Sequence, residues 1–175
     1  MGAYVHGSVG TSEEIPYSDF DGLVIIKNDC FESPQSLFRL AGVLKETEMI
    51  MFEMDPLQHH GWFVMIESEL KHYPEEYFPH VLFHFTKCLF GLHNLTFSVR
   101  KSGYKHEFEN ALLNLCNSVE AKIISGSFLE NFYSLKNWMS ECMLLPAIFV
   151  QAKTGDGIFK KFSFEKAKSV STADF

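Results

Sequence analysis

Two carboxylates near the start of the chain, Asp19 and Asp21, are the residues most capable of chemistry in this sequence. They are two positions apart, so on an extended strand both side chains lie on the same face, roughly 6–7 Å from each other. Carboxylate oxygens at that spacing suit the shared coordination of a divalent cation. Upstream, Gly7 lets a phosphate approach the backbone closely, and the hydroxyl of Ser8 can donate a hydrogen bond to it.

Two short strands and the loop between them must position these residues. The sequence predicts a first strand at about residues 3–7, a loop over 8–18 that contains Gly, Ser, Thr and Pro, and a second strand at about 20–27. The second strand carries an apolar run at residues 23–26, which places it in a core. We therefore expect the carboxylate pair to be held rigidly.

Residues 7–22 resemble the signature of the DNA polymerase beta-like nucleotidyltransferase superfamily. That signature is an apolar residue, Gly, then Gly or Ser, a loop, and Asp-x-Asp or Asp-x-Glu in a hydrophobic strand. The resemblance covers about the first 27 residues and extends more loosely to about residue 70. Two positions depart from it, since His6 replaces the usual apolar residue and Gly22 a usually bulkier one. Neither is a metal-binding position.

The resemblance implies transfer of a nucleoside monophosphate from a nucleoside triphosphate to a hydroxyl of a small molecule or a protein, with Mg²⁺. It implies that Asp19 and Asp21 hold the metal and that Gly7 and Ser8 bind the triphosphate. The superfamily adds a third carboxylate on a neighbouring strand, and two metal ions then clamp the attacking and leaving oxygens. Such in-line displacement needs mainly positioning and charge neutralisation.

For the third carboxylate and metal ligand, we favour Asp55, which would also help to deprotonate the acceptor. It stands before the turn at residues 59–61 and a predicted strand. The alternative interpretation is that Asp55 only forms a turn with Pro56, in which case its carboxylate should cap a backbone N–H. The acidic residues available for the role are Glu48, Glu53, Asp55 and Glu67.

The turn at residues 55–61 contains two adjacent histidines, His59 and His60. It is weakly similar to a Pro-Leu-x-His-Gly stretch in aminoglycoside nucleotidyltransferases of the kanamycin type. The histidines could contact phosphate, ligate a metal or orient a substrate hydroxyl, and a neutral imidazole near pH 7 could also act as a base. Packing in a turn is the plainer interpretation.

Ser33 and Pro34 predict a helix start, with Ser33 as the N-cap and Pro34 at the first helical position. Apolar residues at helical spacing, Leu37, Leu40, Ala41 and Leu44, should face the sheet. Residues 49–66 are ambiguous, because residues 49–52 could finish the helix or form a strand. In the second case, a hairpin of 49–54 with 61–67 would extend the sheet. From about residue 106 the pattern is helical. Apolar residues fit one helix face at Phe108, Leu112, Leu115 and Val119.

The expected fold class is α+β: a nucleotidyltransferase-like small mixed sheet with flanking helices, followed by a helical C-terminal unit. We expect a catalytic unit over residues 1–70, a connector over 71–106 and a helical substrate-side domain over 107–175. The chain begins almost on its first strand, whereas a helix usually precedes that strand in the superfamily. This start fits a truncated reading frame or a fragment.

The composition of the chain limits the kinds of molecule that it is expected to bind. The chain has 175 residues, 46% of them apolar, and a net charge of −7 from 22 acidic and 15 basic residues. A polynucleotide partner is disfavoured, because such surfaces need clustered Lys and Arg. The four cysteines are widely spaced, which indicates free thiols in a reducing cytoplasm, and no apolar run is long enough for a membrane span.

A rival function belongs to a different class. The chain could be a non-catalytic module that keeps the nucleotidyltransferase fold and binds a nucleotide or a partner protein. The uncertain third carboxylate and the missing first helix both favour this alternative. Removal of one carboxylate would separate the two, since only an enzyme has an activity to lose.

Overall fold

The computed structural model describes residues 2–16, 18–73, 75, 78–91, 93, 95–99 and 105–172. The chain forms two compact units, the first made of Met1–Tyr73 with Phe83–Val99 and the second of Pro74–Leu82 with Arg100–Phe175. The segment expected to be a connector, residues 71–106, is thus divided between the two units.

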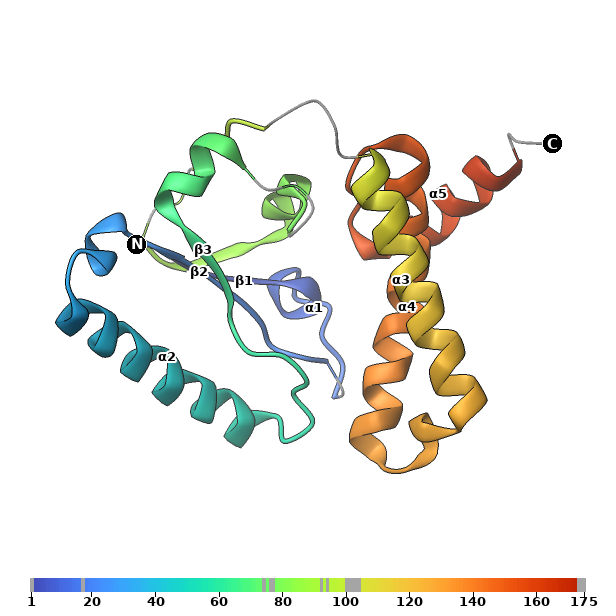
Figure 1. The fold of residues 1–175 in the computed structure, drawn as a ribbon, viewed down its shortest axis with the longest axis horizontal. Coiled ribbons are helices and arrows are strands. Elements are labelled where there is room, and N and C mark those ends of the chain that lie inside the picture. The colour runs from blue at the N-terminus through green and yellow to red at the C-terminus, as the bar shows by residue number, and fades with distance from the viewer. Residues whose placement is uncertain are drawn as a thin grey trace. The chain divides into compact units, whose positions relative to one another are not determined.

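The first unit contains a four-stranded mixed sheet in the order β3-β2-β1-β4 (Figure 1). Its strands are β1 (Gly2–His6), β2 (Asp21–Ile26), β3 (Phe63–Ile66) and β4 (Lys87–Phe90). Strand β1 is antiparallel to both β2 and β4, whereas β2 and β3 are parallel. The α+β class with a mixed sheet is therefore confirmed. The hairpin interpretation of residues 49–67 is wrong, because β3 pairs with β2 and residues 49–54 are helical.

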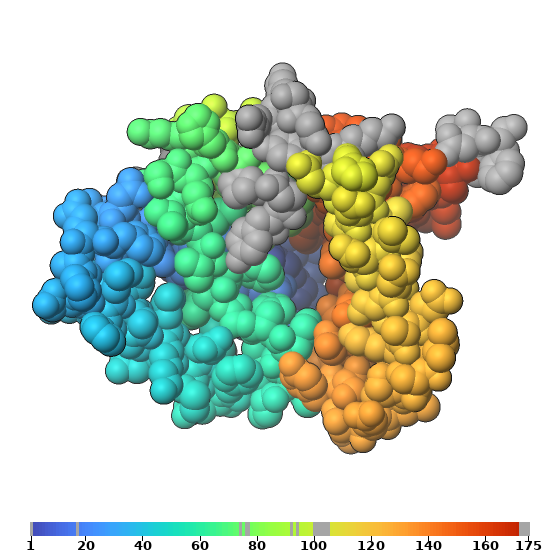
Figure 2. Space-filling model, viewed as in Figure 1, coloured from blue at the N-terminus to red at the C-terminus, as the bar shows by residue number. Residues whose placement is uncertain are grey.

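Helix α2 (Pro34–Met54) crosses over between these two parallel strands. It begins as predicted, with the Ser36 N–H donating to Ser33 Oγ at 3.1 Å. The predicted sheet-facing stripe is wrong in part, since Leu37 is 41% exposed and Ala41 is also exposed. Met51 is the one residue buried among those described in α2. Figure 2 accordingly shows much of this helix, in blue to cyan, at the surface.

The core of the first unit lies on strands β1, β2 and β3. Leu23 and Ile26 of β2 and Met65 of β3 are almost completely inaccessible, as is Tyr4 of β1. Alternate residues of a strand point to opposite faces, so Leu23 and Ile26 anchor both faces of β2. The remaining short elements are α1 (Gly7–Gly10), η1 (Asn28–Phe31), η2 (Glu67–His72), η3 (His80–Phe85) and η4 (Ser127–Leu129).

The second unit is helical, with α3 (Lys105–Ser125) and α4 (Phe132–Thr154) side by side and α5 (Lys160–Thr172) packed against α4. The predicted face of α3 is confirmed, because Phe108 and Val119 are buried and Leu112 and Leu115 are half-buried. Helix α4 runs through Pro146 and ends at Gly155, whose φ of +79° suits glycine. None of the helices described is both long and apolar enough to cross a membrane.

Candidate functional site

The Gly7–Asp21 contact joins the two halves of the sequence motif. In the antiparallel pairing of β1 and β2, His6 stands opposite Asp21, and Gly7 follows directly. Gly7 has a φ of +66°, and a Cβ at this position would overlap the Asp21 carboxylate. Glycine is therefore required here both by backbone conformation and by the approach of the acid. The turn that begins with Gly7 and Ser8 is thus placed beside Asp21.

Asp19 lies outside the strand. Strand β2 begins only at Asp21, and the Gly22 N–H donates to the Phe20 carbonyl at 3.1 Å, which bends the chain at Asp21. The expected geometry, with both carboxylates on one face of an extended strand, is therefore wrong. The local turn chemistry overrides the period of two that the spacing indicated.

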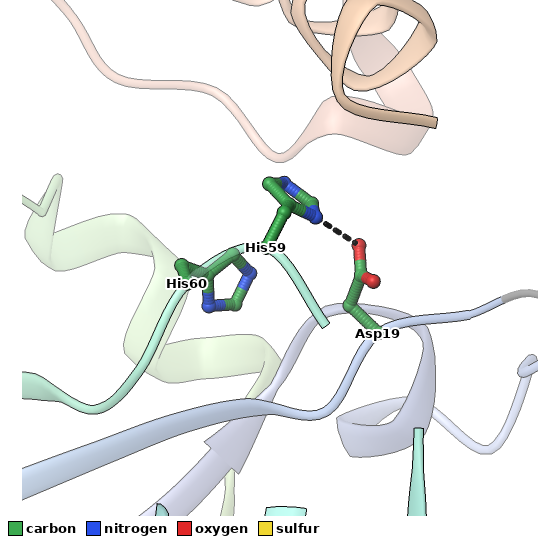
Figure 3. Close-up of side chains that lie close together, drawn as sticks. All are labelled: Asp19, His59 and His60. Atoms are coloured by element: carbon green, nitrogen blue, oxygen red, sulfur yellow. Dashed lines mark ion pairs between the residues drawn. The ribbon is translucent and has the colours of Figure 1, made fainter. Parts of the chain in front are cut away.

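Each carboxylate instead faces one of the two adjacent histidines. His59 Nδ1 lies 3.4 Å from Asp19 Oδ2, and His60 Nε2 lies 3.0 Å from Asp21 Oδ1. The two imidazole rings are in edge contact, with their centroids 4.7 Å apart. Figure 3 shows His59 turned toward Asp19, with His60 beside it.

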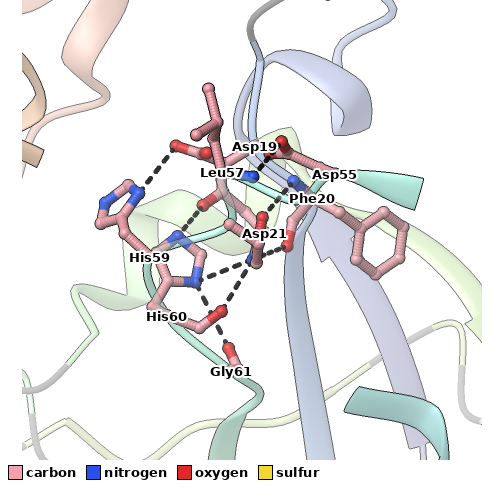
Figure 4. Close-up of polar contacts among 9 residues, drawn as sticks. Asp19, Phe20, Asp21, Asp55, Leu57, His59, His60 and Gly61 are labelled. Carbon is pink, nitrogen blue, oxygen red and sulfur yellow. Dashed lines mark hydrogen bonds and ion pairs between the residues drawn. The ribbon is translucent and has the colours of Figure 1, made fainter. Parts of the chain in front are cut away.

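Gln58 fixes this arrangement, and it was not predicted from the sequence. Its side chain is 1% exposed, and Nε2 donates to the Phe20 carbonyl at 3.0 Å and to the His60 carbonyl at 2.8 Å. Its Oε1 accepts the Phe20 N–H at 3.2 Å. The amide thus holds the histidine loop against the segment before β2. Figure 4 shows the polar contacts around Phe20 and His60, the two residues that it joins. Its place within the turn beside the histidines was the only available signal.

Asp55 behaves as a turn-former. It ends α2, and its Oδ1 accepts the Leu57 N–H at 2.9 Å, while its backbone carbonyl accepts the Gln58 N–H at 3.0 Å. Among the other acidic candidates, Glu48 lies beside Gly61, where a Cβ would meet its carboxylate, and Glu67 begins η2. The described groups of candidate metal ligands include none of these acids.

The two residues that depart from the signature, His6 and Gly22, pack against aromatic side chains near the site. His6 packs against Phe63 of β3, with ring centroids 5.2 Å apart. Gly22 leaves room for the Trp62 ring, which a Cβ would otherwise strike. Trp62 in turn donates from Nε1 to Thr47 Oγ1 of α2 at 2.9 Å. Both departures therefore have a packing explanation.

The pKa values of the two half-buried histidines His6 and His60 shift in opposite directions. Burial alone would lower the pKa of His60, but its hydrogen bond to Asp21 and the Asp21 charge, with smaller contributions from the Gly61 carbonyl and Asp19, raise it above the ordinary value. Burial lowers the pKa of His6, against the opposing charge of Asp21. The aspartates thus favour a protonated imidazole at His60 rather than at His6.

The site as a whole combines acids and imidazoles that can bind a cation. One ligand atom from each of Asp19, His59 and His60 lies within 4.8 Å of the other two. Asp21 and the Gly7 turn adjoin this group through His60. No protein-family model, curated protein or solved structure matches the chain. The function must therefore be inferred from the residues and their geometry.

Proposed function

We propose that the protein is a nucleotidyltransferase that moves a nucleoside monophosphate from a nucleoside triphosphate to a hydroxyl of a small molecule or a protein, using Mg²⁺. One observation carries the proposal: the Gly7–Ser8 turn lies against the Asp21 carboxylate, with Asp19 two residues earlier. A phosphate-binding turn must adjoin the carboxylates that hold its metal, and this contact fits that requirement.

The acids fit the proposed metal. The side chains of Asp19 and Asp21 are 16% and 23% exposed, so their oxygens are largely desolvated yet still reachable. Oxygen ligands from one or two carboxylates, together with phosphates and waters, are what Mg²⁺ usually takes. When bound, the cation would supply neutralisation of the triphosphate charge. Because the Asp21 carboxylate lies against Gly7, the phosphates would reach this turn through the metal that Asp21 holds, and the Ser8 hydroxyl would donate to one of them.

The proposed acceptor is a small molecule or a protein side chain rather than a polynucleotide. The net charge of −7 would repel a phosphate backbone, whereas a single nucleotide can be held through the metal. The acceptor hydroxyl must lie in line with the leaving pyrophosphate, so it would approach from the side of Asp19 and Asp21.

Calorimetric titration of each nucleoside triphosphate, with and without Mg²⁺, tests the proposal. We expect Asp21→Asn to weaken Mg²⁺-dependent binding by about tenfold or more, equivalent to at least about 1.4 kcal/mol. The substitution keeps an acceptor for His60, and the exposed Asp29→Asn is the matched control. Equal affinity of Asp21→Asn and the unmodified chain would overturn the metal role.

Asp55→Asn separates the two roles considered for that residue. An amide oxygen can still accept the Leu57 N–H, so the turn should survive. If Asp55 only forms the turn, triphosphate binding stays unchanged, and this is the outcome we expect from its observed hydrogen bond. Loss of Mg²⁺-dependent binding with an intact fold would instead restore Asp55 as the third metal ligand.

A second candidate is the non-catalytic module that binds a nucleotide without transferring it. It is favoured by the partners of the acids, since Asp19 and Asp21 face histidines and no third carboxylate joins them among the described residues. Release of pyrophosphate in the presence of a panel of hydroxyl acceptors distinguishes the two. Tight Mg²⁺-dependent binding without any pyrophosphate release would select the module.

A further inference from the structure

The group formed by Asp19, His59 and His60 has the dimensions of a metal site. Two ligand atoms on one Zn²⁺ ion, bound at about 2.0–2.2 Å, lie about 3.4 Å apart in a tetrahedral site and never more than about 4.4 Å apart. The three ligand atoms here lie within 4.8 Å of one another, and His59 Nδ1 and Asp19 Oδ2 are 3.4 Å apart. Small side-chain rotations would therefore allow all three ligand atoms to bind one ion.

His59 supplies an independent indication of a ligand. Its side chain is 13% exposed, and its Nδ1 atom is buried without a hydrogen bond to any residue that the structure describes. The separation of 3.4 Å from Asp19 Oδ2 is long for a hydrogen bond between these groups. A buried polar atom of this kind calls for an explanation, and a bound ion that both atoms share provides one.

The surrounding contacts hold the ligands in place, as the outer contacts of metal sites do. Asp21 Oδ1 lies 3.0 Å from His60 Nε2 and orients that ring, and the metal would replace one of the ring protons that face Asp21 and the Gly61 carbonyl. Gln58 binds the His60 carbonyl and the Phe20 backbone, which sets His60 and the residue after Asp19 in one frame. The ligands therefore come from two segments that a buried side chain locks together.

The donor atoms decide the class of metal. Two imidazoles and one carboxylate suit borderline ions such as Zn²⁺, whereas Mg²⁺ prefers an environment made of oxygen. Two histidines with one acid, and a position left for water or substrate, is a ligand set that catalytic zinc sites use. An all-oxygen ion would leave both imidazoles unused.

We infer that Asp19, His59 and His60 form a binding site for a transition-metal cation of the Zn²⁺ class, with Asp21 orienting His60. The inference concerns the same part of the molecule as the proposed function and goes beyond it, because it names a second metal class and two new ligands. It rests on ligand geometry and holds whether or not the protein transfers nucleotides.

Calorimetric titration of the untagged, chelator-treated protein with Zn²⁺ alone tests this site. We expect one equivalent to bind in the presence of excess Mg²⁺, and His59→Gln and Asp19→Asn each to weaken binding by about tenfold or more. His72→Gln, a change at an exposed histidine of the same unit, is the matched control and should bind as the unmodified chain does. Circular dichroism confirms that each variant is folded.

X-ray absorption of the Zn²⁺-loaded protein identifies the atoms that bind the metal. This is needed because four free cysteines offer other places for Zn²⁺. Nitrogen and oxygen neighbours at about 2.0–2.2 Å support the site, whereas sulfur at about 2.3 Å overturns it. Absence of binding, or binding unaffected by His59→Gln, also overturns it. Triphosphate titration is read separately: Zn²⁺ binding without nucleotide binding refutes the proposed function and leaves this inference intact.

Discussion

At the scale of single residues, the site is made of residue pairs in which each member depends on the other. Gly7 is useful only because Asp21 fills the space that a Cβ would take, and each aspartate is matched to one histidine. The residue types of the motif were predictable from the sequence, since Asp-x-Asp after a Gly-Ser pair is a recognisable pattern. The His–Asp pairing was not predictable, because it joins residues about forty positions apart through a loop of irregular shape.

The histidines at this site predict a pH dependence of stability in the chelator-treated protein. His60 has a pKa above its unfolded value of about 6.5, so its stabilising contribution is complete below that pH and is lost as the pH rises through the folded pKa. His6 has a pKa below its unfolded value, so it destabilises the fold as the pH falls below about 6.5.

Urea unfolding across this pH range, followed by Trp62 fluorescence in a Trp138→Phe background, measures both effects in the first unit. His60→Gln should remove the part of the decline above about pH 6.5 that protonation of His60 causes. His6→Gln should remove the part of the decline in the free energy of unfolding that occurs below about pH 6.5. A pH profile that His60→Gln leaves unchanged would contradict the assigned Asp21–His60 interaction.

At the scale of elements, the regular pieces were predictable and their pairing was not. The start of α2 followed from Ser33 and Pro34, because capping is a local interaction. The pairing of β3 with β2 was missed, since residues 49–54 are apolar enough to fit a strand as well as a helix end. Parallel pairing also needs a crossover connection, and no local feature of residues 61–67 indicates which strand they pair with.

Gln58 is the element-scale link between the histidine loop and the segment before β2. Gln58→Leu should lower the free energy of unfolding of the first unit by about 2–4 kcal/mol, because it leaves the half-buried Phe20 N–H and the His60 C=O without this partner. It also removes one of the two hydrogen bonds that the Phe20 C=O accepts, the other being from the Gly22 N–H. The exposed Gln35→Leu is the control and should change stability by less than about 0.5 kcal/mol. Trp62 fluorescence during urea unfolding is the measurement.

The same variant links stability to function. If Gln58 positions His60, folded Gln58→Leu should bind Zn²⁺ and Mg²⁺-triphosphate more weakly than the unmodified chain does, at a temperature where both are native. A variant that is destabilised and yet binds both normally would show that the amide serves the fold alone.

At the scale of the whole molecule, the chain does not divide where the sequence pattern changes. It passes between the two units at residues 73–74, 82–83 and 99–100, so Pro74–Leu82 belongs to the helical unit although residues of the first unit flank it on both sides. Within this segment Phe78 is buried, and Glu75 accepts the His80 N–H at 3.2 Å and pairs with its ring. Sequence periodicity indicates helices and strands, whereas membership of a unit depends on contacts between distant residues.

Gly157 tests this assignment, because it lies where the segment meets the helical unit. A Cβ at Gly157 would strike the ring of Pro79 and approach Val81. The proline ring is rigid and cannot turn aside, so Gly157→Ala should lower the free energy of unfolding of the second unit by about 1–3 kcal/mol. Fluorescence of Trp138 in a Trp62→Phe background reports that unit.

The control is another glycine with the opposite expected sign. Gly42 lies within α2, and a Cβ there would meet nothing within 4 Å. Gly42→Ala should therefore stabilise the first unit by about 0.5–1 kcal/mol, through helix propensity alone. If Gly157→Ala were as harmless as Gly42→Ala, Pro79 would not be packed against residue 157. The segment Pro74–Leu82 would then have to be assigned to the sheet unit that flanks it in sequence.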